Sequence, residues 1–196
     1  MRHLVIMVKE PRPGRVKTRL AREIGNVPAA WWFRHQSARL IRRLARDPRW
    51  QTWLAVSPDT AMWSRVWPAE LRRLPQGAGD LGDRMGRVMR SLPPGPVLVI
   101  GADIPGITPA HIEEAFRALS ADAVFGPALD GGYWLVGLKR VRIPATLFRG
   151  VRWSSPSALA DSKASLGRGF SVSEVAELHD VDTLADLQAL ALPIWR

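Results

Sequence analysis

A basic loop at residues 9–20, "KEPRPGRVKTRL", combines several cations with Pro and Gly. Four cations and one hydroxyl fall within eight residues, namely Arg12, Arg15, Lys17, Thr18 and Arg19. A glycine-bearing loop that runs into a helix start, with Lys and Arg beside it, suits a polyphosphate. The spacing matches neither the Walker loop nor the dinucleotide-binding fingerprint, so a solvated basic turn is the alternative.

Two aspartates form a second group of candidate residues. Asp103 lies in "GADIPGITP", where small residues leave space around it, and Asp182 lies in "LHDVDTLADL", directly before Thr183. Magnesium takes one or two carboxylates of this kind together with substrate phosphates. Two unpaired carboxylates about 4 Å apart repel by about 4 kcal/mol at an effective dielectric constant of 20, so convergence of the two aspartates would favour a divalent cation. The alternative for each is capping of a turn or helix.

Asp130 stands in "GPALDGGYWLVGL", a stretch that begins and ends like a buried strand. Glycine weakens a strand interior and marks a bulge or a close approach by another group, and two glycines follow directly, Gly131 and Gly132. We interpret the stretch as two strand segments around a loop that a ligand approaches, with Asp130 as a hydroxyl ligand or a base. Asp130 should then face the same cavity as Asp103 and Lys17. The competing interpretation is a tight turn capped by Asp130.

The elements that must position these residues alternate between short apolar runs and helices. Apolar runs predict strands at residues 4–8, 53–56, 97–100, 124–125 and 133–136. Helices are expected at residues 28–46, 81–92, 108–119, with Thr108 as the cap, and 183–190. The alternation predicts a mainly parallel sheet covered on both faces, in one domain spanning residues 1–196. Ligands of such sheets bind beyond the carboxyl ends of the strands, where the candidate residues lie.

The composition argues against several classes of site. The chain has no cysteine, so disulfides and cysteine-ligated metals are excluded. Its four histidines show no metal-binding spacing, and no G-x-S-x-G motif is present. Of nine tryptophans, Trp134 and Trp153 are the candidates for stacking on a base or a sugar. The N-terminal apolar run is too short for a signal peptide and no stretch suits a membrane helix, so we expect a cytoplasmic protein without a membrane partner.

The net charge of +10 raises a different alternative, a non-catalytic basic nucleic-acid-binding module. Only four of the 28 basic residues are lysine, and the arginines are spread along the whole chain. A general bias toward arginine on solvated faces explains this distribution, so nucleic acid is not the expected partner. Among acidic partners, a phosphate-bearing small molecule is as good a candidate as DNA.

Six motifs occur in order over nearly the whole chain: "KEPRPGRVKTRL", "GDLGDRM", "GADIPGITP", "GPALDGGYWLVGL", "GVRW" and "DVDTLADL". Together they resemble the bacterial transferases associated with radical-SAM/selenodomain gene clusters, within the nucleotide-diphospho-sugar transferase superfamily. That family is similar to phospholactate and molybdenum-cofactor guanylyltransferases. The resemblance implies the GT-A fold, a three-layer α/β/α arrangement around a mixed, mostly parallel sheet.

The resemblance also implies roles for individual residues. The loop after the first strand would hold the nucleotide through Lys9, Pro13, Gly14, Lys17 and Arg19. Asp103 would correspond to the metal-binding aspartate. Glycosyltransferases of this fold typically carry Asp-x-Asp there, whereas this chain has Gly101-Ala102-Asp103, so a carboxylate from elsewhere is needed. The departure weakens sugar transfer relative to nucleotide transfer without deciding between them.

The sequence therefore predicts a metal-dependent transferase with a nucleotide-activated donor. Glycosyl transfer from an NDP-sugar is the first candidate, and nucleotidyl transfer from an NTP to a phosphorylated acceptor is the alternative. The expected catalytic residues are Asp103, Asp130 and Lys17, with Mg²⁺ or Mn²⁺ on Asp103 and Asp182. The expected nucleotide-binding residues are Lys9, Pro13, Gly14, Arg15, Lys17, Thr18, Arg19, Gly131 and Gly132. The small-molecule acceptor is unidentified, and a homo-oligomer stays open.

Overall fold

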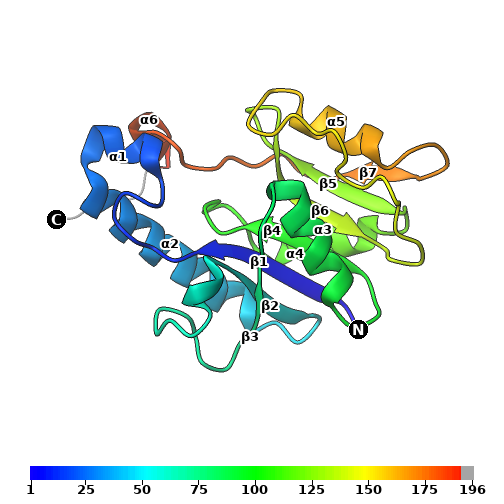
Figure 1. Cartoon of the computed structure of the whole chain (residues 1–196), viewed down its shortest axis with the longest axis horizontal. Coiled ribbons are helices and arrows are strands. Elements are labelled where there is room, and N and C mark those ends of the chain that lie inside the picture. Colours follow the sequence, from blue (N-terminus) through cyan, green and yellow to red (C-terminus); the bar gives the residue numbers. More distant parts are fainter. Residues whose placement is uncertain (191–196) are drawn as a thin grey trace.

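A seven-stranded sheet forms the centre of the computed structural model, which describes residues 1–190 (Figure 1). The strands are β1 (His3–Lys9), β2 (Gln51–Ser57), β3 (Arg72–Pro75), β4 (Val97–Gly101), β5 (Ala123–Pro127), β6 (Tyr133–Leu138) and β7 (Val172–Glu174). The helices are α1 (Thr18–Ile24), α2 (Asn26–Ala45), α3 (Leu81–Ser91), α4 (Pro109–Ala118), α5 (Ala158–Ser165) and α6 (Leu184–Ala189), with a 3-10 turn η1 (Asp59–Ala61). The predicted domain runs to residue 196, and residues 191–196 lie outside the described part.

The strand order is β3-β2-β1-β4-β6-β5-β7. β1 pairs in parallel with β2 and β4, and β2 pairs in parallel with β3. β6 runs antiparallel to both of its neighbours, β4 and β5, while β5 and β7 are parallel. The predicted mixed, mostly parallel sheet is therefore confirmed. The carboxyl ends of β1 and β4 lie next to each other, which brings the basic loop and Asp103 to one edge.

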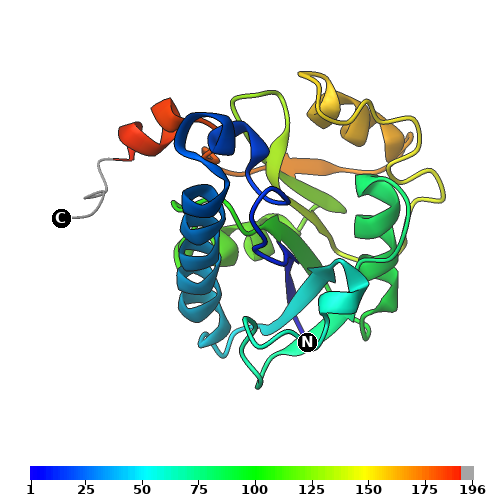
Figure 2. The same cartoon turned by 60° about the vertical axis from the view of Figure 1, so that its left-hand side comes forward.

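Side-chain alternation along each strand explains the three layers. In β1, Leu4, Ile6 and Val8 belong to the apolar cluster that includes α2 and α4, whereas Val5 belongs to the cluster that includes α3. Successive strand residues point to opposite faces, so a strand that is apolar throughout needs helices on both sides. Figure 2 shows α2 and α3 on opposite sides of the sheet. None of the described helices is both long enough and apolar enough to span a membrane.

The helix starts follow local capping chemistry. Thr108 accepts from the His111 backbone N–H at the start of α4, as the sequence predicts. At the start of α6 it is Thr183 that accepts from the Asp186 N–H, and not Asp182, which the sequence offered as a cap. Such caps satisfy backbone donors that have no partner inside the helix. Asp182 is therefore not the cap of α6, and its carboxylate is available for other contacts.

The stretch containing Asp130 forms a hairpin of β5 and β6, which confirms the prediction of two strands around a loop. The glycines inside it have neighbours from the protein itself. A Cβ on Gly126 would lie 2.4 Å from the Trp134 ring, and a Cβ on Gly131, at φ +81°, would lie 2.2 Å from the Pro156 carbonyl oxygen. These two glycines allow the core and the segment before α5 to pack closely against the hairpin.

Five elements lie outside the predicted set, one of them the 3-10 turn η1. β3 and β7 are short edge strands, and α5 is a short helix whose apolar residues follow no clear stripe. α1 begins at Thr18, within the segment predicted as the basic loop. Figure 1 shows α1 beside α6, beyond the carboxyl end of β1. A small separate core lies there, formed by Leu20, Ala29, Val181 and Leu187.

Candidate active site

Lys17 joins two aspartates that come from distant parts of the chain. Its Nζ lies 2.7 Å from Asp103 Oδ2 and 2.7 Å from Asp182 Oδ1. Arg19 Nη1 donates to Asp182 Oδ2 at 3.0 Å. The Lys17 side chain is 5% exposed, while those of Asp103 and Asp182 are 31% and 33% exposed. The ammonium therefore lies behind the carboxylates, which keep open faces toward solvent.

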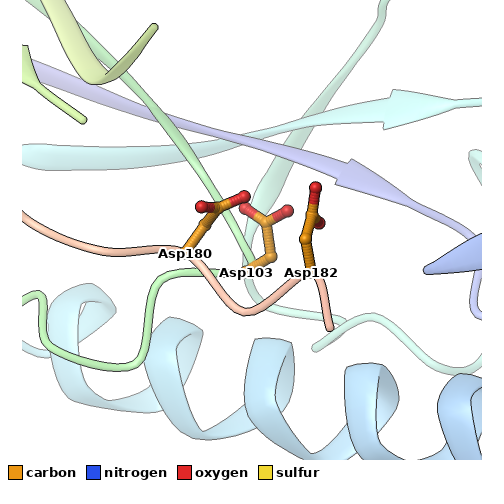
Figure 3. A group of neighbouring side chains, drawn as sticks. All are labelled: Asp103, Asp180 and Asp182. Carbon is orange, nitrogen blue, oxygen red and sulfur yellow. The ribbon is translucent and has the colours of Figure 1, made fainter. Parts of the chain in front are cut away.

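A third carboxylate, Asp180, completes an acidic group at this edge. One oxygen from each of Asp103, Asp180 and Asp182 lies within 4.8 Å of the others. Figure 3 shows the three side chains rising to the same side of their backbones, Asp103 from the segment after β4 and the other two from the segment before α6. Hard divalent cations prefer such oxygen ligands, so the group fits Mg²⁺ or Mn²⁺.

The electrostatics of this group indicate surplus negative charge. Burial and the neighbouring Asp182 carboxylate raise the pKa of Asp180 to about 6, although Lys17 acts in the opposite direction. Burial disfavours the charged form of Lys17, but the Asp103 and Asp182 carboxylates outweigh it and raise its pKa. Lys17 and the exposed Arg19 thus supply two positive charges beside three carboxylates, and a divalent cation would relieve the remaining negative charge.

Local structure fixes each of these side chains. Lys17 precedes α1 with left-handed backbone angles, φ 45° and ψ 50°, which non-glycine residues adopt at a cost. Asp103 follows β4 after Gly101 and the buried Ala102. Asp180 and Asp182 flank Val181, which is 1% exposed and packs in the small core with Leu20. Because Val181 points inward, its two neighbours are turned to the opposite side, where their carboxylates approach Asp103.

Two cavities meet at Asp103. The larger, about 530 Å³, is lined by four of the predicted cations, Lys9, Arg15, Lys17 and Arg19, and by Thr18 and Asp182. The smaller, about 260 Å³, is lined by Asp130, Gly132, Asp180, Trp153, Ser154 and Ser155. Asp103, Tyr133 and Trp134 line both cavities. The acidic group therefore lies at the junction between a basic and an acidic cavity.

Asp130 takes part in both interpretations of its loop. Its Oδ1 accepts from the Gly132 N–H at 2.9 Å, as a capped turn requires. It also lines the smaller cavity with Asp103, but it is not among the residues that line the larger cavity with Lys17. The expected shared cavity is thus found for Asp103 and not for Lys17.

Three expected nucleotide-binding residues line neither cavity: Pro13, Gly14 and Gly131. Pro13 and Gly14 are exposed, and Gly14 has a φ of +72° that suits a turn. The close neighbour of Gly131 is the Pro156 backbone. These residues therefore belong to a turn or to a close packing contact and do not line either cavity.

Some site residues have no role assigned from the sequence. Asp180 is the most important, and the spacing Asp180-Val181-Asp182 was the available signal, since alternate residues of an extended segment face the same side. Gln76 lines the larger cavity and donates to the Val8 and Ala55 carbonyls, which ties the ends of β1 and β2 together. Its side chain gave no signal in the sequence.

Solved structures share this fold. A Desulfovibrio desulfuricans G20 protein, provisionally named a nucleotide-diphospho-sugar transferase, has 30% identity and a TM-score of 0.87, covering 96% of this chain and 85% of that one. CMP:2-keto-3-deoxy-manno-octonic acid synthetase, complexed with CTP, has 14% identity and a TM-score of 0.60, covering 96% of each chain. Rv0371c of Mycobacterium tuberculosis H37Rv, complexed with manganese, has 16% identity and a TM-score of 0.53, covering 96% and 97%. The predicted nucleotide-diphospho-sugar transferase fold is confirmed, whereas the radical-SAM association stays a prediction.

Sequence comparison gives the family. No curated protein sequence matches this chain. The family model described as "Uncharacterized protein conserved in bacteria (DUF2064)" matches residues 40–155, which include Asp103 and Asp130. Because this segment is more than half of the chain, the protein belongs to the DUF2064 family.

Proposed function

We propose that this protein is a divalent-metal-dependent transferase that moves a glycosyl group from a nucleotide-diphospho-sugar to a small acceptor. The observation that carries the proposal is the position of Asp103 at the junction of the two cavities, in contact with Lys17. A group that passes between two bound substrates needs such a junction. The name and 30% identity of the Desulfovibrio relative support the same class of reaction.

The larger cavity suits the donor. Lys9, Arg15, Lys17 and Arg19 supply positive charge to a diphosphate, and Thr18 adds a hydroxyl. Hydrogen bonds from ionised donors to phosphate oxygens are about twice as strong as neutral ones. The apolar part of the same wall, including Phe33 and Met85, offers a surface for the less polar parts of a nucleotide.

Asp103, Asp180 and Asp182 would hold the cation. Their oxygens lie close enough to share one ion, and burial together with the neighbouring Asp182 carboxylate raises the pKa of Asp180, which supports a site where added positive charge is favourable. A bound Mg²⁺ or Mn²⁺ would supply charge neutralisation to the leaving diphosphate. The manganese complex of Rv0371c, a protein with the same fold, is consistent with this assignment.

Asp130 suits the acceptor side. In the proposed step, a hydroxyl oxygen of the acceptor forms a bond to the anomeric carbon of the donor sugar. The bond from that carbon to the diphosphate oxygen breaks, and the nucleoside diphosphate leaves with this oxygen. Asp130, the carboxylate of the smaller cavity that lies outside the acidic group, takes the hydroxyl proton, and Lys17 stabilises charge near the diphosphate.

Nucleotidyl transfer is the second candidate. Gly101 stands where the glycosyltransferase pattern has its first aspartate, and the structure with CTP shows that this fold also serves a nucleotide-binding synthetase. The products separate the two reactions. Glycosyl transfer releases a nucleoside diphosphate from an NDP-sugar, whereas nucleotidyl transfer releases pyrophosphate from an NTP.

Thermal denaturation with NTPs, NDPs and NDP-sugars, each with and without Mg²⁺ or Mn²⁺, tests the proposal. A ligand at 100 times its dissociation constant stabilises a protein by about 2.7 kcal/mol. For a chain of this size this raises the melting temperature by roughly 5–11 °C. We expect the largest metal-dependent shift with an NDP-sugar. No shift with any nucleotide would contradict the proposal.

A further inference from the structure

We propose that the smaller cavity binds an acceptor that carries hydroxyl groups but no phosphate or other anionic group, such as a neutral sugar or polyol. This inference rests on the proposed function, because it assigns the smaller cavity to the acceptor. It adds the chemical class of that acceptor, which the donor-binding argument leaves open.

The two cavities differ sharply in charge. Among the lining residues that the structure describes, the smaller cavity has three carboxylates and no Lys, Arg or His. These carboxylates are Asp103, Asp130 and Asp180. The larger cavity, in contrast, has four cations along its wall. A phosphate would gain favourable contacts in the larger cavity and face like charges in the smaller one.

Two cations that neighbour lining residues of the smaller cavity are already engaged elsewhere. Arg152 precedes Trp153 in the chain, but its Nε and Nη2 donate to the Asp161 carboxylate at 2.8 and 2.9 Å. Lys17 contacts Asp103 and Asp182 and lines the larger cavity only. Even a divalent cation on the acidic group would leave Asp130 uncompensated, because Asp130 is not part of that group.

The remaining wall is suited to a sugar-sized polyol. Asp130 Oδ1 accepts from the Gly132 N–H, while no described residue donates to its second oxygen, which leaves that oxygen for a ligand hydroxyl. Ser154 adds a hydroxyl that can both donate and accept. Trp153 supplies an apolar ring, and it fits there because Gly82 has no side chain where the ring lies. Few polar groups on an apolar wall are typical of small-molecule sites.

The size of the cavity agrees with this class. Its volume of about 260 Å³ lies below the roughly 300–1,000 Å³ of sites for drug-sized ligands. A compound of about one sugar ring is therefore the expected occupant. A neutral acceptor of this kind reacts through a hydroxyl, as the proposed glycosyl transfer requires.

Matched pairs of compounds test the proposal directly. Binding of glucose and glucose 6-phosphate, and of glycerol and glycerol 3-phosphate, would be measured by saturation-transfer NMR on the whole protein with saturating Mg²⁺. Asp130→Asn is the first variant, because an asparagine oxygen can still accept from Gly132 and keep the turn. Trp153→Phe is the second variant at this cavity, and Arg19→Ala reports on the larger one.

We expect at least one uncharged compound to bind, and to bind about tenfold more weakly in Asp130→Asn or Trp153→Phe. The phosphorylated counterpart of that compound should bind at the smaller cavity about tenfold more weakly than the uncharged compound. Phosphate binding that is lost in Arg19→Ala belongs to the larger cavity and agrees with the proposal. No binding by either uncharged compound would overturn it, and so would equal binding of a phosphorylated partner that depends on Asp130.

The outcome is distinguishable from failure of the transferase proposal. Nucleotide binding is measured by thermal denaturation without any acceptor, so it reports on the larger cavity alone. If the uncharged compounds bind and no nucleotide does, the charge assignment of the smaller cavity stands and the transferase assignment fails. The opposite pattern leaves the donor site intact and rejects the acceptor class.

Discussion

Lys17 Nζ lies 2.7 Å from Asp103 Oδ2, so a cation that follows β1 meets a carboxylate that follows the adjacent strand β4. The same ammonium contacts Asp182, 165 residues further along the chain. This contact holds the donor cavity and the acidic group in one arrangement.

Replacing Lys17 by methionine should lower the free energy of unfolding of the metal-free protein. The two aspartates would lose their shared partner, which we expect to cost about 1–2 kcal/mol, less than the roughly 3–5 kcal/mol for a fully buried pair, because both carboxylates are partly exposed. Since the folded-state pKa of Lys17 is raised, this stabilisation is present below its ordinary pKa of 10.5 and is lost as the pH rises through the folded value. Chemical denaturation at pH 7 measures the difference.

Mg²⁺ should stabilise the Lys17→Met variant more than the wild type, because the cation no longer competes with an ammonium. Lys9→Met is the matched control, since Lys9 lines the same cavity without an ion pair to any described residue. An equal loss of stability in both variants would argue against the role of the Lys17 contacts.

Asp103→Asn should abolish the metal-dependent part of any nucleotide-induced thermal shift while leaving the fold intact. The amide removes one anionic ligand from a group of three, and Mg²⁺ depends strongly on ligand charge. Circular dichroism checks the fold, and titration with Mn²⁺ checks metal affinity. An unchanged metal response would remove Asp103 from the site.

Asp180 should make the metal-free protein less stable at neutral pH. Its pKa is raised from 3.8 to about 6, so the folded state favours the proton, and the stability that this provides is present below pH 4 and is lost as the pH rises to 6. Asp180→Asn should therefore raise the melting temperature at pH 7 by about 2–4 °C, or about 1 kcal/mol after allowance for solvent screening. The measurement is thermal denaturation in a chelator from pH 4 to 7, with Glu177→Gln on the same exposed segment as the control.

Arg19→Ala should weaken nucleotide binding by about tenfold, because it removes one charge-assisted contact from the donor cavity. Stability should hardly change, since the Arg19 side chain is 64% exposed and its pair with Asp182 is a surface ion pair. Arg22→Ala is the control, because Arg22 lies on the same helix outside the cavity lining. Equal losses of affinity in both variants would indicate a general charge effect.

Gly126→Ala should destabilise the fold by about 1–3 kcal/mol, because the new methyl group would overlap the buried Trp134 ring. Gly106→Ala is the matched control, since the nearest atom to its Cβ would be 3.9 Å away. Urea denaturation compares the two. Similar stabilities would show that the ring can move aside, and the glycine would then need another explanation.

The sequence predicts the central strands because they are apolar throughout, as in residues 97–100. β3 and β7 escape prediction because edge strands need not be apolar, and β3 contains two arginines. Convergence of Asp103 with Asp182 could only be stated as a condition, because it depends on how Val181 packs against Leu20. Such a contact between distant segments leaves no local pattern.

Asp180 was not predicted as a ligand because one aspartate from each segment already completes the expected metal pair, Asp103 and Asp182. Residues 101–103 lack the first aspartate of the Asp-x-Asp pattern, whereas residues 180–182 carry a complete Asp-x-Asp. The fold brings both segments together, so the carboxylate count is restored from another part of the chain.

The segment after β7 supplies two of the three carboxylates while contributing no strand. It crosses the end of the hairpin, where the Val175 and Leu178 N–H groups donate to the Phe125 and Pro127 carbonyls. All seven strands of the described sheet precede residue 180, so the sheet and two of the three carboxylates come from separate stretches of the chain. A chain truncated before Asp180 would keep every described strand but lose two of the three carboxylates and the part of the small core that Val181 and Leu187 supply.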